Sequence, residues 1–432
     1  MPISTIMEKW RFRASTYLII SATTVFLGLI REIWVASAFG LSAGFDAYAA
    51  IFGFYLFFGN QLPNAFETTL ISKYAGGEDT ATRQAFLSTS LAHTVFTACL
   101  LLLLIMVGRP VIAIIFGDNF AVDTAFAIAL LFIPAVLFAG LVFILRAGLY
   151  LKRSYAPGML YNGVVSLSVI VSMILFQNNF AVLSLPLGYA LGSATMLVAM
   201  TLLLRRNYER KPLKNSISLS AFRGILAAAA LVMAGECFFQ AGFTAERAFA
   251  VRISKGSVAA YYYAIAFLTV LITVFITPLN TVLFPRLSEK FNKGRLTLGE
   301  INRLCLWLAV AGIGFAVVLS MAAGHVVQLV LVRGQFTVED AQRTSRILAV
   351  VVYVMPFMCT ERLLRYCLMA MKDFGCAIWS NSLRLAIILA AAPIMIRRNG
   401  ITGLAEVYVA AGVVSVAFLF LRMRRLAKRR LA

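Results

Sequence analysis

The sequence has few charged residues, and acidic ones are especially scarce. Charged residues make up 13% of the 432-residue chain, which has 18 Asp and Glu residues against 39 Lys and Arg residues. Soluble domains carry about 25% charged residues, whereas 61% of this chain is hydrophobic. This composition excludes an ordinary soluble domain and predicts an integral membrane protein.

The chain also lacks the motifs of metal sites and of common catalytic sites. Its two histidines, His93 and His325, lie far apart, and its six cysteines are scattered through apolar segments without the paired spacing of a zinc site. It has no Walker-A phosphate-binding motif, no HExxH and no GxSxG. We therefore expect a protein that is not an enzyme, with no catalytic residues, no metal and no cofactor.

The excess of positive charge has a recognisable distribution. Lys and Arg gather at the ends of apolar runs, as in the tail RMRRLAKRRLA (422–432), and not along one polar face. This positive-inside pattern argues against nucleic acid as a partner. It predicts a multi-pass protein of the bacterial inner membrane with both termini in the cytoplasm. The first apolar run has no small-residue cleavage site, so we expect it to remain as the first helix.

Apolar runs of membrane-spanning length recur along the whole chain. At about 20 apolar residues per crossing, the sequence predicts an all-α polytopic membrane protein with about twelve transmembrane helices. The expected spans are 16–39, 46–71, 86–107, 124–150, 157–176, 182–204, 223–245, 257–284, 302–323, 345–370, 375–396 and 402–421. The charged stretch 205–222 is the expected linker, which predicts two six-helix bundles, 1–210 and 211–432.

The two halves share residues in the same order. One group of residues recurs 215 positions later: Ser42, Tyr48, Ala49 and Pro63 correspond to Ser257, Tyr263, Ala264 and Pro278. A second group recurs 219 positions later: Arg146, Leu149 and Asn162 correspond to Arg365, Leu368 and Asn381. An even number of helices per half makes such repeats parallel. Parallel repeats place a substrate site in a central cavity at their interface.

Several ionisable residues lie within otherwise apolar sequence. Each costs roughly 3 kcal/mol or more at the centre of a bilayer, so we expect each to be paired or to face a wet cavity. The candidate substrate-binding residues are Arg31, Glu32, Asp46, Glu67, Glu236, Arg247, Arg252 and Arg384.

Each acidic candidate has two interpretations. Arg31 and Glu32 form either a neutralised pair or an anion contact facing the cavity. Asp46 follows a glycine turn and either caps the second helix or faces the cavity. Glu67 and Glu236 either pair with a base on another helix or carry protons.

The basic candidates are also open to two interpretations. Arg247 and Arg252 either extend to the headgroups at a membrane face or bind substrate. Arg146 and Arg365 either set topology or contact the substrate. Arg384 lies within an apolar span, where it is either paired or bound to the substrate.

Four segments carry a family resemblance. GLIREIWVASAFGLSAGFDAYAA (28–50) resembles the first helical hairpin of the MviN/MurJ-type lipid flippases of the multidrug/oligosaccharidyl-lipid/polysaccharide exporter superfamily. The resemblance continues in ERAFAVRISKGSVAAYYYAIAF (246–267), LFPRLSEKF (283–291) and RYCLMAMKD (365–373). It implies two six-helix bundles around a central cavity, and flipping of an undecaprenyl-diphosphate-linked saccharide by alternating access.

The resemblance also implies cavity arginines that this chain lacks. The corresponding positions are Val25, Gly59, Asn60 and Ala266, whereas Arg31 and Asp46 are retained. We therefore predict a transporter that flips an undecaprenyl-diphosphate-linked oligosaccharide to the periplasmic leaflet for cell-envelope polysaccharide synthesis. Its expected partners are that lipid-linked substrate, membrane lipids and polysaccharide-assembly enzymes.

Three alternatives remain open. One is a flippase for lipid II, the peptidoglycan precursor. Another is a MATE-like multidrug or cation antiporter, which would depend on acidic residues such as Glu67 and Glu236. The third is a membrane scaffold without transport activity, whose buried charges would tolerate neutral substitution.

Overall fold

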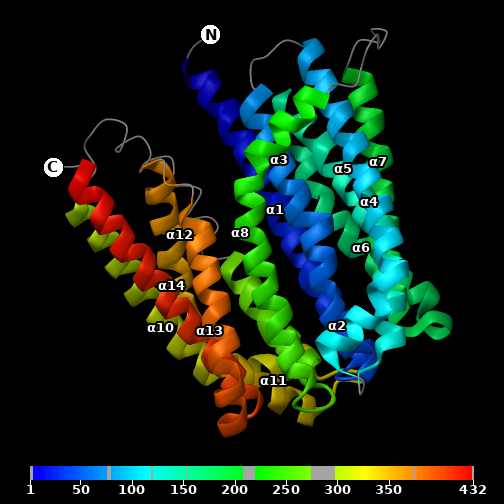
Figure 1. Ribbon diagram of the computed structural model, residues 1–432, viewed down its shortest axis with the longest axis vertical. Helices are drawn as coiled ribbons and strands as arrows, with labels where there is room; N and C mark the ends of the chain where they lie inside the picture. The colour runs from blue at the N-terminus through cyan, green and yellow to red at the C-terminus, as the bar shows by residue number, and fades with distance from the viewer. Residues whose placement is uncertain are drawn as a thin grey trace. The chain divides into compact units, whose positions relative to one another are not determined.

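The computed structural model describes residues 3–74, 79–117, 120–152, 154–207, 219–273, 297–371, 373 and 375–430. Within these residues the secondary structure is helical, without a strand (Figure 1). The predicted all-α fold class is therefore confirmed. The physical reason is that a segment crossing lipid must satisfy its backbone hydrogen bonds internally, and a helix does so.

The first half of the chain contains long helices separated by short turns. Its elements are α1 (Ile3–Phe39), α2 (Ala43–Tyr55), η1 (Leu56–Gln61), α3 (Leu62–Tyr74), α4 (Asp79–Phe116), α5 (Val122–Leu151), α6 (Ala156–Phe180), η2 (Ala181–Leu183) and α7 (Ser184–Asn207). The second half contains α8 (Leu219–Val251), an apolar helix Ser257–Thr273, α10 (Leu298–Leu331), α11 (Val338–Val351), η3 (Val352–Val354), α12 (Met355–Ala370), α13 (Cys376–Asn399) and α14 (Ile401–Arg430).

The predicted spans agree with these helices. Each of the twelve falls on one helix or on helices that follow one another without a break, and the eighth is described as far as Thr273. Eight helical stretches of the described chain are long and apolar enough to cross a membrane, and one of them contains both α6 and α7. The predicted linker 205–222 and the segment 283–291 lie largely or wholly outside the described residues.

Two spans change helix type just before a proline. The π-helical stretch η1, in which the N–H of Leu62 donates to the carbonyl of Phe57, ends at Gln61, two residues before Pro63. The 3₁₀ stretch η3 ends at Val354, two residues before Pro356. Proline has no N–H to donate to the carbonyl four residues earlier, which allows another hydrogen-bond pattern in the preceding turn. Pro110, Pro134 and Pro393 lie inside α-helices without such a change, so proline alone does not determine it.

The chain forms two compact units. Unit 1 consists of Met1–Trp34, Phe54–Ile114 and Ala121–Met233, and unit 2 consists of Val35–Gly53, Ile115–Phe120 and Ala234–Ala432. The long helices α1, α2, α4 and α8 therefore contribute residues to both units. The predicted bundles 1–210 and 211–432 divide the chain at one point, whereas each of these units combines several segments. The two-bundle division therefore stays a prediction.

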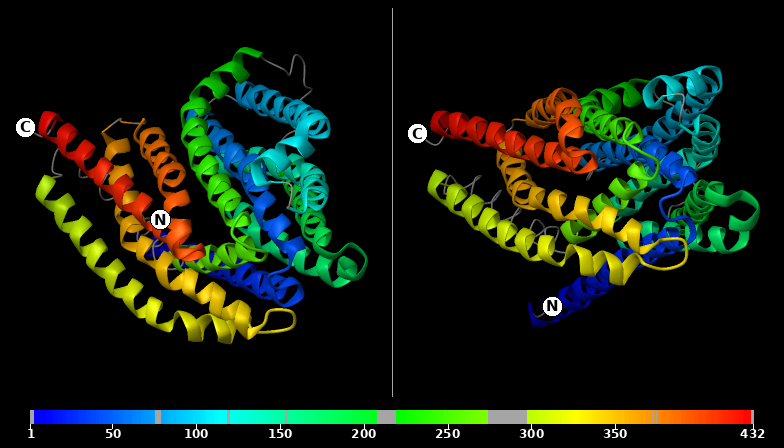
Figure 2. Two further views of the ribbon diagram at one scale, coloured as in Figure 1. Left: turned by 60° about the horizontal axis from the view of Figure 1, so that its bottom comes forward. Right: turned by 90° about the horizontal axis from the view of Figure 1, so that it is seen from below.

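Each unit has its own apolar core. In unit 1, α3 packs on α5, which packs on α7, and one core includes Phe66, Ile144 and Ile225. In unit 2, α10 packs on α11 and α12, and α14 packs on α11, α12 and α13, as Figures 1 and 2 show. A core there includes Leu364 and Leu419. These cores fix the helices that carry the charged side chains.

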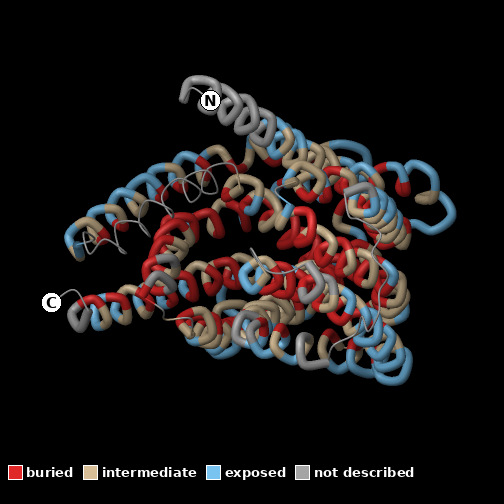
Figure 3. Tube along the Cα trace, turned by 90° about the horizontal axis from the view of Figure 1, so that it is seen from above, coloured by how far each residue is buried: buried red, intermediate tan, exposed pale blue. Residues whose placement is uncertain are grey.

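The helices also present apolar residues outward. Figure 3 shows exposed positions recurring along helices that bury their other face. On α10 the exposed residues include Trp307, Val310, Val318 and Met321. Large exposed apolar side chains are the expected surface of a helix that meets lipid.

Candidate functional site

Arg31 and Glu32, which are neighbours on α1, form an ion pair in unit 1. Arg31 Nη2 donates to Glu32 Oε1 at 2.5 Å, and Nη1 donates to Ser166 Oγ on α6 at 3.5 Å. The guanidinium also lies 5.5 Å from the ring centroid of Tyr189 on α7. The side chains are 18% and 12% exposed. The pair therefore joins α1 to α6 and α7 and remains partly accessible.

Glu67 on α3 is paired with Arg146 on α5. Arg146 Nε donates to Glu67 Oε1 at 2.8 Å, and Nη2 donates to Oε2. The guanidinium also lies 4.0 Å from the ring centroid of Phe143. The structure therefore supports the first interpretation of Glu67, an ion pair with a basic residue on another helix. This bidentate geometry is the strong form of an arginine–carboxylate pair.

Asp46 in unit 2 accepts hydrogen bonds from the start of a different helix. Its Oδ2 accepts from the N–H of Gly256 at 2.5 Å, and its Oδ1 accepts from the N–H of Ala259 at 2.8 Å. Helix α2 is capped instead by Ser42, whose Oγ accepts from Phe45 N at 3.3 Å. The expectation that Asp46 caps its own helix is therefore wrong, because the side chain reaches residues more than 200 positions away in sequence.

The turn beside Asp46 is held by a residue that the sequence analysis did not single out. Arg343 on α11 donates to the carbonyl of Lys255 at 3.1 Å and to Ser254 Oγ at 2.6 Å. Nearby, Gln335 N donates to Ser37 O at 2.7 Å. Arg343 lies in an ordinary polar stretch of the sequence, which gives no signal of this role.

A buried charged cluster lies within unit 2. Tyr261 donates from its hydroxyl to Glu246 Oε2 at 3.0 Å, and Arg384 on α13 lies 4.3 Å from the ring centroid of Tyr408. Glu246 is 1% exposed and Arg384 is 6% exposed. Glu246 Oε1 and Arg384 Nη2 are buried and have no hydrogen-bond partner among the described residues. The cluster therefore has unused donor and acceptor capacity at membrane depth.

The neighbouring arginines Arg247 and Arg252 differ in environment. Arg252, just beyond α8, is exposed. Arg247 near the end of α8 is 5% exposed, and its guanidinium lies 5.4 Å from the ring centroid of Phe243. The interpretation that Arg247 extends to the lipid headgroups is therefore wrong, because unit 2 encloses its side chain.

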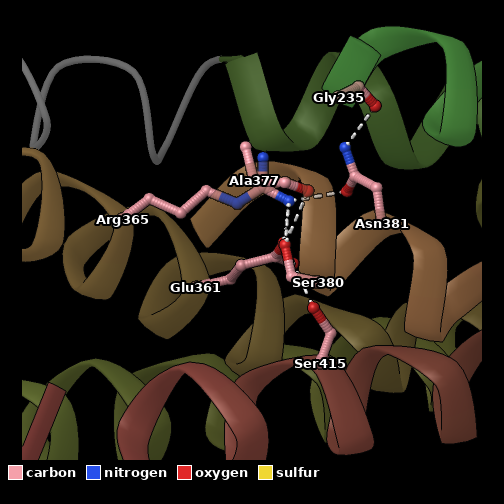
Figure 4. Close-up of polar contacts among 7 residues, drawn as sticks. All are labelled: Gly235, Glu361, Arg365, Ala377, Ser380, Asn381 and Ser415. Carbon is pink, nitrogen blue, oxygen red and sulfur yellow. Dashed lines mark hydrogen bonds and ion pairs between the residues drawn. The ribbon is translucent and has the colours of Figure 1, made fainter. Parts of the chain in front are cut away.

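Arg365 on α12 is the centre of a polar network that joins three helices (Figure 4). Its Nη2 donates to Glu361 Oε1 at 2.6 Å, to Ser380 Oγ at 3.0 Å and to Asn381 Oδ1 at 2.7 Å. Asn381 Nδ2 then donates to the carbonyl of Gly235 on α8 at 2.8 Å. The network therefore holds α8, α12 and α13 together.

Two further residues surround this network. Ser415 Oγ on α14 donates to Glu361 Oε1 at 3.4 Å. Glu236, next to Gly235, is half-buried and interacts electrostatically with Arg365. Arg146 and Arg365, which correspond in the predicted repeat, both bind a carboxylate that is at most 12% exposed. Lys372 lies outside the described residues.

No group of three or more His, Cys, Asp or Glu residues that could hold a metal ion occurs in the described part of the chain. The described charged groups instead offer donors and acceptors of hydrogen bonds.

Comparisons with known proteins identify relatives along nearly the whole chain. The family described as lipid II flippase MurJ matches residues 35–430. A probable lipid II flippase MurJ of Bdellovibrio bacteriovorus is 24% identical over 450 residues, which cover 95% of this chain and 82% of that protein.

Solved structures share the fold. A lipid II flippase MurJ in the inward closed conformation matches with a TM-score of 0.82 at 19% identity, covering 95% of this chain and 87% of the other. An inward-facing multidrug resistance MATE family transporter of the MOP superfamily matches with a TM-score of 0.76 at 15% identity, covering 97% and 100%. A MOP superfamily transporter from Pyrococcus furiosus matches with a TM-score of 0.64 at 13% identity, covering 96% and 95%.

Proposed function

Because the chain belongs to the MurJ family of lipid II flippases, we propose that it flips a lipid with a diphosphate-linked saccharide headgroup across the bacterial inner membrane. The headgroup must cross about 30 Å of hydrocarbon while its prenyl tail stays in lipid. Fixed positive charge compensates for the hydration that a diphosphate loses on entering the protein. Alternating access would then carry the headgroup to the periplasmic leaflet.

The observation that carries this proposal is the burial of two arginines with free donor atoms. Arg247 Nη1 and Arg384 Nη2 are enclosed in unit 2 and have no hydrogen-bond partner among the described residues. Both guanidinium groups interact electrostatically with the buried carboxylate of Glu246, but a buried donor atom that stays unsatisfied is unfavourable. An anionic headgroup supplies the missing partner, which gives these arginines a role in binding.

Lipid II is the first substrate to test, because it is the substrate in the names of the family and of the Bdellovibrio relative. The chain should be expressed in a bacterial strain depleted of its own lipid II flippase. We expect restored growth and lipid II exposed on the periplasmic face. Failure to restore growth by protein that accumulates in the membrane would contradict lipid II as the substrate.

A different undecaprenyl-diphosphate oligosaccharide, used in exopolysaccharide, capsule or O-antigen synthesis, is the second candidate. It is the substrate that the sequence predicts from the four positions without the arginines of the resemblance, one of which is Gly59. A Cβ atom there would lie 2.8 Å from the ring of Tyr55, so the space beside Gly59 is filled by that ring. Translocation of each lipid by the purified protein in vesicles distinguishes the two candidates.

The antiporter alternative is less well supported. It requires carboxylates free to exchange protons or cations, but Glu67 binds Arg146 through both oxygens. For the orientation, we propose that both termini lie in the cytoplasm, from the positive-inside pattern. Reporter fusions at Ala432 and within 205–222 should be active in the cytosol, and a periplasmic signal at either site would contradict this topology.

A further inference from the structure

Two buried hydrogen-bond donors of α8 meet at one point beside α2, within unit 2. Arg247 Nη1 and Gln240 Nε2 are both buried and have no hydrogen-bond partner among the described residues. The two residues are seven positions apart, which is about two helical turns, so they lie on the same face of α8. A Cβ atom placed on Gly53 of α2 would collide with both nitrogens. Both donors therefore approach the same point next to Gly53.

The charge of Arg247 interacts with the adjacent carboxylate of Glu246, but its Nη1 donor has no hydrogen-bond partner among the described residues. The adjacent carboxylate of Glu246 accepts its hydrogen bond from Tyr261, and its other oxygen has no hydrogen-bond partner. Arg247 is 5% exposed, so water cannot replace the missing partner freely. A buried guanidinium with a free donor is expensive unless a ligand pairs with it.

Aromatic rings line the same region. Tyr48 and Tyr262 are among the groups that interact electrostatically with Arg247. The ring of Tyr262 packs at 5.9 Å from that of Phe52 and at 6.3 Å from that of Tyr48, centroid to centroid. Such rings exclude water and strengthen the interaction of a cation with an anion.

We propose that Gly53, Gln240 and Arg247 form a binding site for a phosphate oxygen of the substrate diphosphate. This proposal rests on the proposed function for the identity of the anion. Arg247 supplies a charged donor and Gln240 supplies a neutral donor, and Gly53 lets both donors approach the α2 backbone closely because it has no side chain. The site supplies positive charge on α8, in a chain that lacks four of the arginines that its family resemblance implies.

Gly53→Ala is the sharpest test, because it keeps both donor groups but its Cβ would collide with both nitrogens and displace them. The matched control is Gly324→Ala on α10, where a Cβ atom would meet nothing within 4 Å. Affinity for inorganic diphosphate and for farnesyl diphosphate is measured by calorimetry on the purified full-length protein. We expect Gly53→Ala to weaken both affinities at least about tenfold, since it removes hydrogen bonds to a charged ligand. Gly324→Ala should bind as the wild type does.

Gln240→Leu is the second variant, and it removes one donor while leaving Gly53 and Arg247 in place. We expect a similar loss of affinity with unchanged thermal stability. Lower stability with unchanged affinity would mean that the Gln240 amide only supports the helix, and would overturn the proposal. If Gly53→Ala does not accumulate, Gln240→Leu decides the question alone.

The remaining outcomes separate this proposal from the proposed function. Wild-type protein that binds neither diphosphate overturns the site. Gly53-dependent binding of inorganic diphosphate without binding of farnesyl diphosphate assigns the site to a free anion and overturns the lipid assignment. The protein could also bind both inorganic diphosphate and farnesyl diphosphate in a Gly53-dependent way and yet translocate no lipid-linked saccharide in vesicles. That result supports the binding site and contradicts the flippase function.

Discussion

Arg146 donates hydrogen bonds from Nε and Nη2 to the two carboxylate oxygens of Glu67 and so joins α5 to α3. The two side chains are 14% and 3% exposed. This pair belongs to unit 1 and lies beside the core that contains Phe66 and Ile144. Its burial makes Glu67 important for stability, independently of any part in transport.

Glu67→Gln should therefore destabilise the protein by about 3 kcal/mol, because it leaves the Arg146 charge without its carboxylate. Thermal unfolding in detergent and abundance in the membrane measure the effect. Glu339→Gln, at an exposed position on α11, is the control and should behave as the wild type. We expect transport per folded molecule to persist in Glu67→Gln. Normal stability combined with lost transport would indicate a proton-carrying carboxylate instead.

Arg31→Ala should reduce transport of the lipid-linked saccharide to background while the protein remains in the membrane. Arg31→Lys should restore only part of it, because lysine offers a point charge and not a planar pair of donors. Arg109→Ala is the control, since Arg109 forms a pair with Asp123 in which the side chains are 65% and 80% exposed. Exposed pairs contribute little. Full activity in Arg31→Ala would exclude Arg31 from substrate binding.

Asp46→Ala should lower the free energy of unfolding by about 1–2 kcal/mol, because it removes an acceptor from the start of helix Ser257–Thr273. Asp46→Asn should cost less, since the amide keeps one acceptor oxygen. Ser42→Ala, which removes a single 3.3 Å bond at the start of α2, should cost the least. Thermal unfolding of the three variants tests this order, and equal losses would contradict the capping role.

Asn381→Leu should destabilise unit 2 by about 2 kcal/mol, since it leaves the carbonyl of Gly235 without its side-chain donor and removes one acceptor from Arg365. Asn162→Leu is a matched control, because Asn162 corresponds to Asn381 in the repeat but is exposed on α6. Chemical denaturation of the purified proteins provides the comparison. Similar stability of the two variants would show that the network of Figure 4 contributes little.

The number, order and approximate ends of the spans could be predicted from the sequence. Runs of about 20 apolar residues form helices in lipid, because each backbone N–H and C=O must find its hydrogen-bond partner within its own segment. These features depend on neighbours in the chain, and the sequence contains them directly.

The partners of the buried charges depended on tertiary structure. The cost of a charge in lipid predicts that Glu67, Asp46 and Arg247 are paired or enclosed, but it does not say by which groups. Glu67 binds a residue 79 positions away, and Asp46 binds backbone N–H groups 210 and 213 positions away. Helical periodicity tells which face of a helix a residue occupies. Only the packing of helices distant in sequence determines what that face meets, because a hydrogen bond forms between atoms about 3 Å apart.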